Sequence, residues 1–171
     1  CHMIEGTING LVVFVPVNIR QNWVREYKKH CPIDVPVFVV ESGKKAAKIT
    51  AEAVKQPMWV AIIGIESLQQ FKKGSVYEAT ITLTLGKHGK YGVIVDESHN
   101  CKGHDANRSK NIRSLSENAE IMGIMTATPQ SQGFEDLYMQ YEVLDPNIIG
   151  QGSFYSFRSR YCIMGGYEGR Q

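Results

Sequence analysis

Five strand-sized apolar runs are distributed along the 171 residues, and the stretches between them carry apolar residues at helical spacing. The runs are continuous rather than alternating, as is typical of strands that are buried on both faces. Their positions are 11–15, 35–40, 58–63, 91–95 and 121–125. Strands of this kind that alternate with helices predict an α/β fold of three layers, in which a mostly parallel central sheet is flanked by helices.

Helices are expected between and after these runs, at 18–30, 44–54, 66–71, 107–116, 133–144 and 154–161. In the first of them, Ile19, Trp23 and Tyr27 recur every four residues and define an apolar face, and Asn18 is a candidate N-cap. The apolar residues of the helix at 133–144 are spaced for one buried face, formed by Phe134, Leu137, Tyr138, Tyr141 and Leu144. Residues 75–90 allow either a strand or a helix, because part of the segment alternates like a strand where a crossover helix is expected.

Composition excludes several classes of protein. The hydrophobic fraction of 43% and the charged fraction of 21% are those of a globular chain. No apolar run is long enough for a membrane span, and no secretory leader is evident, so we expect no membrane partner. The net charge of +2 gives little indication of a partner. Lysines gather at 28–29, 44–48 and 72–73, where they can attract a polyanion or simply form solvated helix faces.

The four cysteines, Cys1, Cys31, Cys101 and Cys162, are far apart and contain no Cys-x-x-Cys pair. We therefore expect no structural zinc and a reducing compartment, either the cytoplasm or the nucleus. The cluster His99, Cys101, His104 and Asp105 matches no familiar zinc spacing, so a metal site there is the less favoured interpretation.

Two adjacent acids, Asp96 and Glu97, follow directly after the run at 91–95. Ligands of an open parallel sheet bind beyond the carboxyl ends of its strands, which is where these acids are expected. A pair of carboxylates suits magnesium–nucleotide chemistry, because one can hold Mg²⁺ through water while the other orients and deprotonates the attacking water. For this dipeptide alone, an exposed acid pair that opens an ordinary loop is an equal alternative.

The run at 121–125 ends in a similar way, with Thr126-Ala127-Thr128-Pro129 in place of the acids. Threonine hydroxyls at a neighbouring strand end can hydrogen-bond the carboxylates and respond to the presence of a γ-phosphate, and Pro129 then turns the chain. Because the two motifs lie one crossover apart, together they indicate a nucleotide-hydrolysing site more strongly than either does alone.

These motifs resemble those of superfamily 2 helicases. Asp96-Glu97-Ser98-His99 resembles the Asp-Glu-x-His box, with Ser98 where alanine is usual. Residues 126–129 resemble the coupling motif, followed by Gln130 and Gln132 as in the Swi/Snf-type branch. Other segments resemble further motifs of that branch in the right order, at 13–16 with 22–26, 62–68, 134–138 and 144–146. From about 11 to 161, the chain is thus similar to the first RecA-like domain of Swi/Snf-type DNA translocases, a fold of the P-loop NTPase type.

The resemblance implies roles for individual residues. Asp96 would bind Mg²⁺ through water, Glu97 would be the catalytic base, and His99 would complete the catalytic box. Thr126 and Thr128 would couple the nucleotide state to motion. Contacts to a nucleic-acid backbone would come from Pro16, Val17, Asn18, Glu66 and Ser67. The implied cofactors are ATP and Mg²⁺, and the implied partners are DNA, in duplex form, and a second RecA-like domain of the same parent chain.

The phosphate-binding pattern Gly-x-x-x-x-Gly-Lys-Ser/Thr does not occur in the sequence. Since residues 1–5 look like the tail of a helix, we expect 1–164 to be a partial helicase ATP-binding domain, cut after that loop. Residues 165–171 would begin the connection to the second domain. The fragment itself is expected to be inactive, and the compact motif spacing favours a bacterial or phage parent over a nuclear, eukaryotic one.

Two other classes of function remain open. The first is a non-catalytic nucleic-acid-binding or scaffold domain that retains the fold, since fold alone does not fix function. The second is an unrelated nucleotide-binding α/β enzyme that uses the acid pair with a metal.

Overall fold

The computed structural model describes residues 2–41, 44–70, 72–84, 89–130 and 133–162. Three predicted features lie outside these described residues: the connection at 165–171, Gln132 after the coupling motif, and Cys1 at the start of the helix tail.

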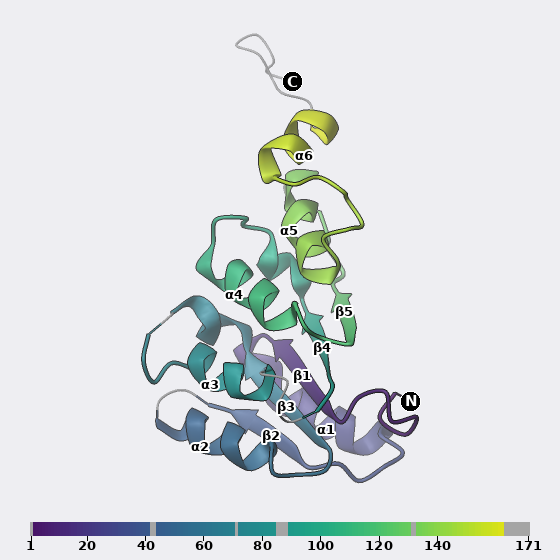
Figure 1. Ribbon diagram of the computed structural model, residues 1–171, viewed down its shortest axis with the longest axis vertical. Coiled ribbons are helices and arrows are strands. Elements are labelled where there is room, and N and C mark those ends of the chain that lie inside the picture. Colours follow the sequence, from purple (N-terminus) through teal and green to yellow (C-terminus); the bar gives the residue numbers. More distant parts are fainter. Residues whose placement is uncertain (1, 42–43, 71, 85–88, 131–132, 163–171) are drawn as a thin grey trace.

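Five parallel strands form one sheet in the order β2-β3-β1-β4-β5 (Figure 1). They are β1 (Gly10–Val15), β2 (Val37–Val40), β3 (Trp59–Gly64), β4 (Tyr91–Asp96) and β5 (Ile121–Met125). Each strand agrees with its predicted run to within two residues at either end. Because all five run in the same direction, their carboxyl ends lie along one edge of the sheet.

Alternate residues of the central strands enter two separate cores. From β1, Val12 and Phe14 enter the larger core, whereas Val13 and Val15 enter the smaller one on the other face. The larger core is covered by α2 (Lys44–Ala53), α3 (Val76–Thr84), α4 (Asn107–Ser116) and α5 (Glu135–Leu144). The smaller core is covered by α1 (Arg20–His30), which lies behind the sheet in Figure 1, and by Met3 and Ile8 from the segment before β1. The predicted three layers are confirmed.

Short 3-10 turns follow three of the strands at their carboxyl ends. A last helix extends the molecule at one end. The turns are η1 (Val17–Ile19) after β1, η2 (Ile65–Gln69) after β3 and η3 (Ser98–Cys101) after β4. The helix α6 (Phe154–Tyr161) packs on α5 at one end of the long axis (Figure 1). No helix in the described part of the chain has the length and apolar character needed to cross a bilayer.

A hydrogen-bonded turn precedes β1. The amide of Gly6 donates to the carbonyl of Met3, and the amide of Thr7 donates to the carbonyl of His2. Gly6 has φ = 72°, in the left-handed region that glycine adopts without strain. This pair of hydrogen bonds around a left-handed glycine is the Schellman motif that ends many helices.

The ambiguous segment at 75–90 contains a helix, α3, where it is described. Ser75 accepts a hydrogen bond from the amide of Glu78, and the carboxylate of Glu78 accepts one from the amide of Gly74. This arrangement is a variant of the capping box, in which serine and a glutamate three residues later satisfy the free amides of a helix start. Thr80 adds a bond from its hydroxyl to the carbonyl of Val76, so its polar atom is satisfied within the helix.

The buried face of α5 differs from the predicted one. Of the five apolar residues expected on it, Tyr138 alone is buried, and Phe134 is 56% exposed. The face that is buried carries Asp136, Tyr138, Met139, Gln140, Glu142 and Val143. Three of the predicted apolar residues, Phe134, Leu137 and Tyr141, instead line a shallow groove of about 360 Å³ together with side chains of α6.

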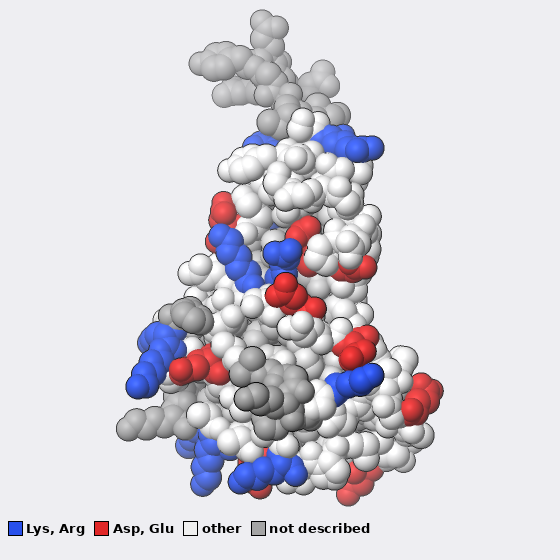
Figure 2. Space-filling model, viewed as in Figure 1, with Lys and Arg blue, Asp and Glu red and all other residues white. Residues whose placement is uncertain are grey.

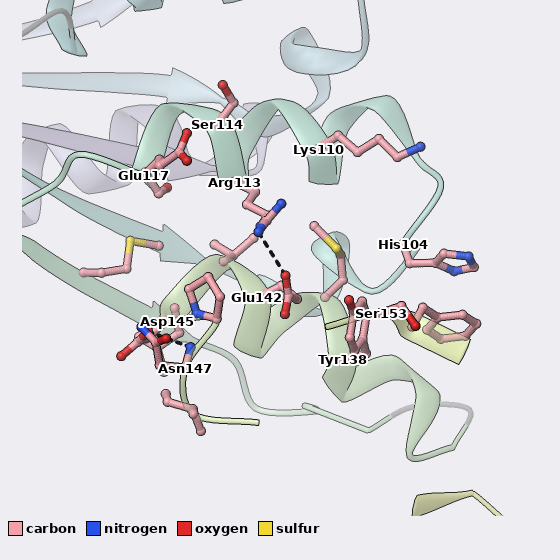
Figure 3. Close-up of a pocket in the computed structure, with 18 of the residues that line it drawn as sticks. His104, Lys110, Arg113, Ser114, Glu117, Tyr138, Glu142, Asp145, Asn147 and Ser153 are labelled. Atoms are coloured by element: carbon pink, nitrogen blue, oxygen red, sulfur yellow. Dashed lines mark hydrogen bonds and ion pairs between the residues drawn. The ribbon is translucent and has the colours of Figure 1, made fainter. Parts of the chain in front are cut away.

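A larger groove of about 1070 Å³ lies between α4, α5 and the residues that lead into α6 (Figure 3). Within it, Arg113 of α4 forms an ion pair with Glu142 of α5, with 3.2 Å between Nη2 and Oε2. Glu142 is 8% exposed, and its burial raises the pKa of the carboxyl, which the charge of Arg113 opposes. None of the residues predicted for the functional site is among those that line this groove.

The close packing of Gly10 against Trp59 generates a first prediction. A β-carbon at Gly10 would lie 2.1 Å from Cζ2 of Trp59, which is 1% exposed and packed in the larger core. We expect Gly10→Ala to lower the free energy of unfolding by about 1–3 kcal/mol, as overpacking of a core does. Gly152→Ala is the control, since a β-carbon there meets nothing within 4 Å. Urea denaturation checks both, and equal stability of the two variants would contradict the packing argument.

Glu142 generates a prediction about pH. Its pKa is higher in the folded chain than its ordinary value of 4.5, so the folded state favours the protonated carboxyl. The stabilisation by this group is therefore complete below about pH 4.5 and is lost as pH rises through the raised pKa. We expect the stability of the natural chain relative to Glu142→Gln to decrease between pH 4 and pH 7, measured by urea denaturation. A relative stability that increases over this range would show that Arg113 outweighs burial.

Candidate active site

The two predicted catalytic motifs lie at adjacent strand ends. Asp96 is the last residue of β4, and its register partner on β5 is Met125, directly before Thr126. The acids of one motif and the hydroxyls of the other therefore leave the sheet side by side. The structure thus brings together Asp96, Glu97, His99 and Thr126, which sequence analysis had assigned to one site.

The carboxylate of Asp96 is held on both of its oxygens. Oδ2 accepts a hydrogen bond of 2.7 Å from Nε1 of Trp23, which reaches it from α1 on the smaller-core face. Oδ1 accepts a bond of 2.8 Å from the amide of Glu97. Sequence analysis had placed Trp23 on the apolar face of its helix and had not assigned it to the site. The signal was available in principle, since a half-buried indole N–H usually finds an acceptor.

Glu97 has an unusual backbone conformation. Its φ of 52° makes it the one non-glycine residue with positive φ in the described part of the chain. Such a residue carries strain that the surrounding structure must compensate, and residues of this kind cluster at functional sites. The turn ends β4 abruptly and starts η3, so Glu97 leaves the sheet at an angle that a continuing strand would not allow.

The side chains of Glu97, His99 and Thr126 form a triangle of contacts. Nδ1 of His99 lies 3.0 Å from Oγ1 of Thr126 and 3.2 Å from Oε2 of Glu97. Oγ1 of Thr126 lies 3.5 Å from the same carboxylate oxygen, at the limit of a hydrogen bond. Thr128 contributes its amide, which donates to Oγ1 of Thr126 at 3.2 Å, while residue 128 is exposed. The triangle therefore joins the motif after β4 to the motif after β5.

Behind the triangle, Ser98 and Gln140 form a buried polar contact. Oγ of Ser98 donates to Oε1 of Gln140 at 2.8 Å. Nε2 of Gln140 donates to the carbonyl of Pro129 at 2.6 Å. Sequence analysis missed Gln140 because glutamine fell outside the apolar pattern that it used to find the buried face of this helix.

The segments predicted to contact nucleic acid leave the neighbouring strands. The amide of Val17, after β1, donates to Oε2 of Glu66, after β3, at 3.1 Å. Gly64 permits this approach, because a β-carbon there would lie 2.5 Å from Cγ2 of Val17. Pro16 and Ser67 are half-buried in the same two segments, which continue the edge beyond β4 and β5.

Asn18 is not the N-cap of α1, contrary to one of its two predicted roles. The N-cap position is occupied by Ile19, without a side-chain capping bond, and Asn18 lies inside η1. The 3-10 turn after Pro16 moves the start of the α-helix two residues along the chain, which leaves Asn18 exposed at the strand-end edge.

Charges on the visible face of the molecule are mixed. Figure 2 shows basic and acidic side chains interspersed, without one continuous basic patch. Of the lysine groups, Lys45 and Lys48 lie exposed in α2, which starts beyond the end of β2, and residues 72–73 lie exposed before α3. Lys28 and Lys29 lie in the last turn of α1, which runs back from the strand ends. Two of the three lysine groups therefore lie on the side of the molecule where the strands end.

The carboxylate oxygens at this site fit a magnesium ion that is bound through water. Each oxygen of Asp96 accepts one hydrogen bond from the protein and so retains a free lone pair. Mg²⁺ prefers oxygen ligands and keeps several waters, so that one or two carboxylates suffice. Among the described residues, no group of three or more His, Cys, Asp and Glu side chains could form a metal cage. A carboxylate beside a second carboxylate, an imidazole and a hydroxyl can bind a hydrated cation and activate a water.

Comparison with known proteins also points to an ATPase related to helicases. The SNF2-related domain family model matches residues 2–164. The human "DNA annealing helicase and endonuclease ZRANB3" is 28% identical over 154 residues, which cover 89% of this chain and 13% of that protein. "Protein CHROMATIN REMODELING 19" of Arabidopsis thaliana is 27% identical over 143 residues, or 81% of this chain and 18% of that protein. The chain thus spans less than a fifth of the curated relatives it matches.

The fold is also found among solved structures. The SWI2/SNF2 ATPase core of Sulfolobus solfataricus in complex with dsDNA superposes with a TM-score of 0.67 and 19% identity, covering 92% of this chain and 29% of that one. This likeness identifies the fold as the RecA-like fold of SWI2/SNF2 ATPase cores. Together with the family match over residues 2–164, it establishes that the chain belongs to the SNF2-related domain family, whose members are related to ATP-dependent DNA helicases and translocases.

Proposed function

We propose that this chain is the water-activating part of an ATPase lobe, in a longer protein that couples ATP hydrolysis to movement along duplex DNA. The observation that carries the proposal is the contact of Glu97, His99 and Thr126 beside Asp96, at the ends of adjacent parallel strands. The family resemblance assigns catalytic and coupling roles to residues of two segments that are distant in sequence. These residues meet in one place, which would not be expected of two unrelated loops.

In this proposal, Glu97 orients and deprotonates the attacking water. Its left-handed backbone directs the side chain away from the strand, and His99 holds one carboxylate oxygen at 3.2 Å. The other oxygen is left to accept a proton from water. Asp96 holds hydrated Mg²⁺, with its orientation set by Trp23 and the amide of Glu97. The chemistry that Mg²⁺ supplies at such sites is neutralisation of charge on the phosphate oxygens.

Thr126 couples the hydrolytic site to motion. Its hydroxyl lies within reach of both Glu97 and His99, so a change at the nucleotide alters the hydrogen bonding of the loop after β5. Thr128 participates through its amide, which is bonded to the same hydroxyl. The loop that carries both threonines is thus a suitable element for transmitting the nucleotide state.

Duplex DNA binds along the ends of β1 and β3. Pro16, Val17, Asn18, Glu66 and Ser67 lie in these two segments, where Asn18 and Ser67 offer polar side chains, and such groups position a phosphate backbone without reading sequence. Lys45 and Lys48 of α2 and the lysines at 72–73 add attraction for a polyanion on this side of the molecule. The solved relative from Sulfolobus solfataricus was obtained with dsDNA, which supports duplex rather than single-stranded DNA as the partner.

Two further parts are required for hydrolysis. In this proposal the parent protein supplies a phosphate-binding loop and a second RecA-like domain, and residues 1–164 form part of its first domain. The 171 residues alone lack the phosphate-binding pattern and are expected to bind ATP weakly.

The base assignment is tested by Glu97→Gln in the full-length parent protein. Glutamine keeps the size of the side chain but cannot accept the proton, so DNA-stimulated ATP hydrolysis should fall roughly a hundredfold or more. Phosphate release with and without duplex DNA is the measurement. Unchanged turnover in Glu97→Gln would show that Glu97 is not the catalytic base. If the natural parent hydrolyses no ATP, a non-catalytic DNA-binding domain is favoured instead.

The role of Trp23 is tested by Trp23→Phe in the same assay. Phenylalanine retains an aromatic ring in the smaller core but has no N–H to hold Oδ2 of Asp96. We expect the magnesium concentration for half-maximal ATPase activity to rise several-fold, because the carboxylate loses a charge-assisted hydrogen bond worth roughly 1.5–3 kcal/mol. Tyr27→Phe, on the same face of α1, is the control and should behave like the natural protein. An unchanged magnesium requirement in Trp23→Phe would contradict the prediction.

A further inference from the structure

Gln140 occupies an unusual position for a glutamine. It lies on α5 with 2% of its surface exposed, and it faces Ser98, which is fully buried in η3. A buried polar side chain is stable where its hydrogen bonds are satisfied, and it becomes costly when one partner is removed. The contact between Ser98 and Gln140 is separate from the triangle formed by Glu97, His99 and Thr126, so its role has to be explained on its own.

The orientation of the amide follows from its partners. Nε2 donates to the carbonyl of Pro129 at 2.6 Å and to the carbonyl of Asp136, one turn back on α5, at 2.9 Å. A flipped amide would place an oxygen against both carbonyl oxygens, so the orientation is fixed. Oε1 must then face Ser98, and the Ser98 hydroxyl has to act as the donor.

Through these bonds, one side chain touches both loops that carry the site. Ser98 directly follows Glu97, and Pro129 directly follows Thr128. On the solvent side the two loops meet through His99 and Thr126, whereas on the buried side they meet through Gln140. The loops are thus joined at two points, and one of these is a residue on a separate helix.

We propose that Gln140 is a positioning residue that, with Ser98, fixes the loop of Thr126 and Thr128 relative to Glu97. It acts on chemistry only through these loops, and its effect on turnover rests on the proposed function of the site. Ser98 and Gln140 work as one unit, because each supplies the buried hydrogen-bond partner of the other.

The first test uses the 171-residue chain and needs no catalysis. Amide hydrogen exchange is measured by NMR for Thr128 and Asn100, whose amides bond within the two loops. We expect Ser98→Ala and Gln140→Met each to raise exchange at these amides by about tenfold, because a buried partner is lost. The amides of β1 should keep their exchange rates. The control is Ser116→Ala, which removes a buried serine hydroxyl bonded only within its own helix.

The double variant tests whether the pair is one unit. If both single changes break the same contact, Ser98→Ala combined with Gln140→Met should exchange no faster than Gln140→Met alone. Additive effects would show that the two side chains act independently. Exchange that rises equally in β1 and in the loops would show a general loss of stability, and either outcome overturns the proposal.

The second test uses the full-length parent and ATP hydrolysis. We expect Gln140→Met to lower kcat about tenfold while the KM for ATP changes less than about twofold, because Gln140 positions the reacting groups without touching the nucleotide. A change confined to KM would contradict the positioning role. If the natural parent shows no ATPase activity, the proposed function fails, whereas the exchange measurements still decide whether Gln140 fixes the loops.

Discussion

The site depends on the parallel hydrogen bonding of β1 to both of its neighbours. Gly10 is paired with Trp59 of β3 on one side and with Tyr91 of β4 on the other, so the three strands end at nearly the same level. That register brings the amide of Val17 to Glu66 and allows the helix after β1 to reach Asp96. A slip by one residue would exchange the two faces of a strand and separate these groups, so the packing of the two cores also sets the geometry of the site.

Much of the sheet could be predicted because its strands are buried on both faces, which leaves continuous apolar runs in the sequence. The helices were harder to predict. The segment at 75–90 alternates like a strand, yet the capping bonds between Ser75 and Glu78 select a helix. The buried face of α5 was predicted wrongly because apolar spacing was assumed to point toward the sheet. In the structure, part of the apolar surface of α5 faces α6 instead of the sheet, and polar residues of α5 are buried.

The candidate site shows the same division. Asp96, Glu97, His99 and Thr126 could be predicted to meet, because chemically active residues that follow parallel strands must leave the sheet along one edge. Trp23 and Gln140 could not be assigned in this way, since neither follows a strand and each reaches the site from a helix distant in sequence. The motifs therefore indicate which groups meet at the strand ends, whereas the supporting contacts depend on how helices pack, and a local pattern does not contain that information.

The placement of the two tryptophans has a practical consequence. Trp59 is 1% exposed and enclosed in the larger core, whereas Trp23 is half-buried and touches the carboxylate of Asp96. Indole emission depends on the charges and solvent around the ring, so the two residues differ in what they can sense. Occupation of the strand-end edge would alter the ultraviolet emission of Trp23 and leave that of Trp59 nearly constant. A ligand at this edge would therefore be detectable by the chain's own fluorescence, with Trp59 as an internal standard and without any attached dye.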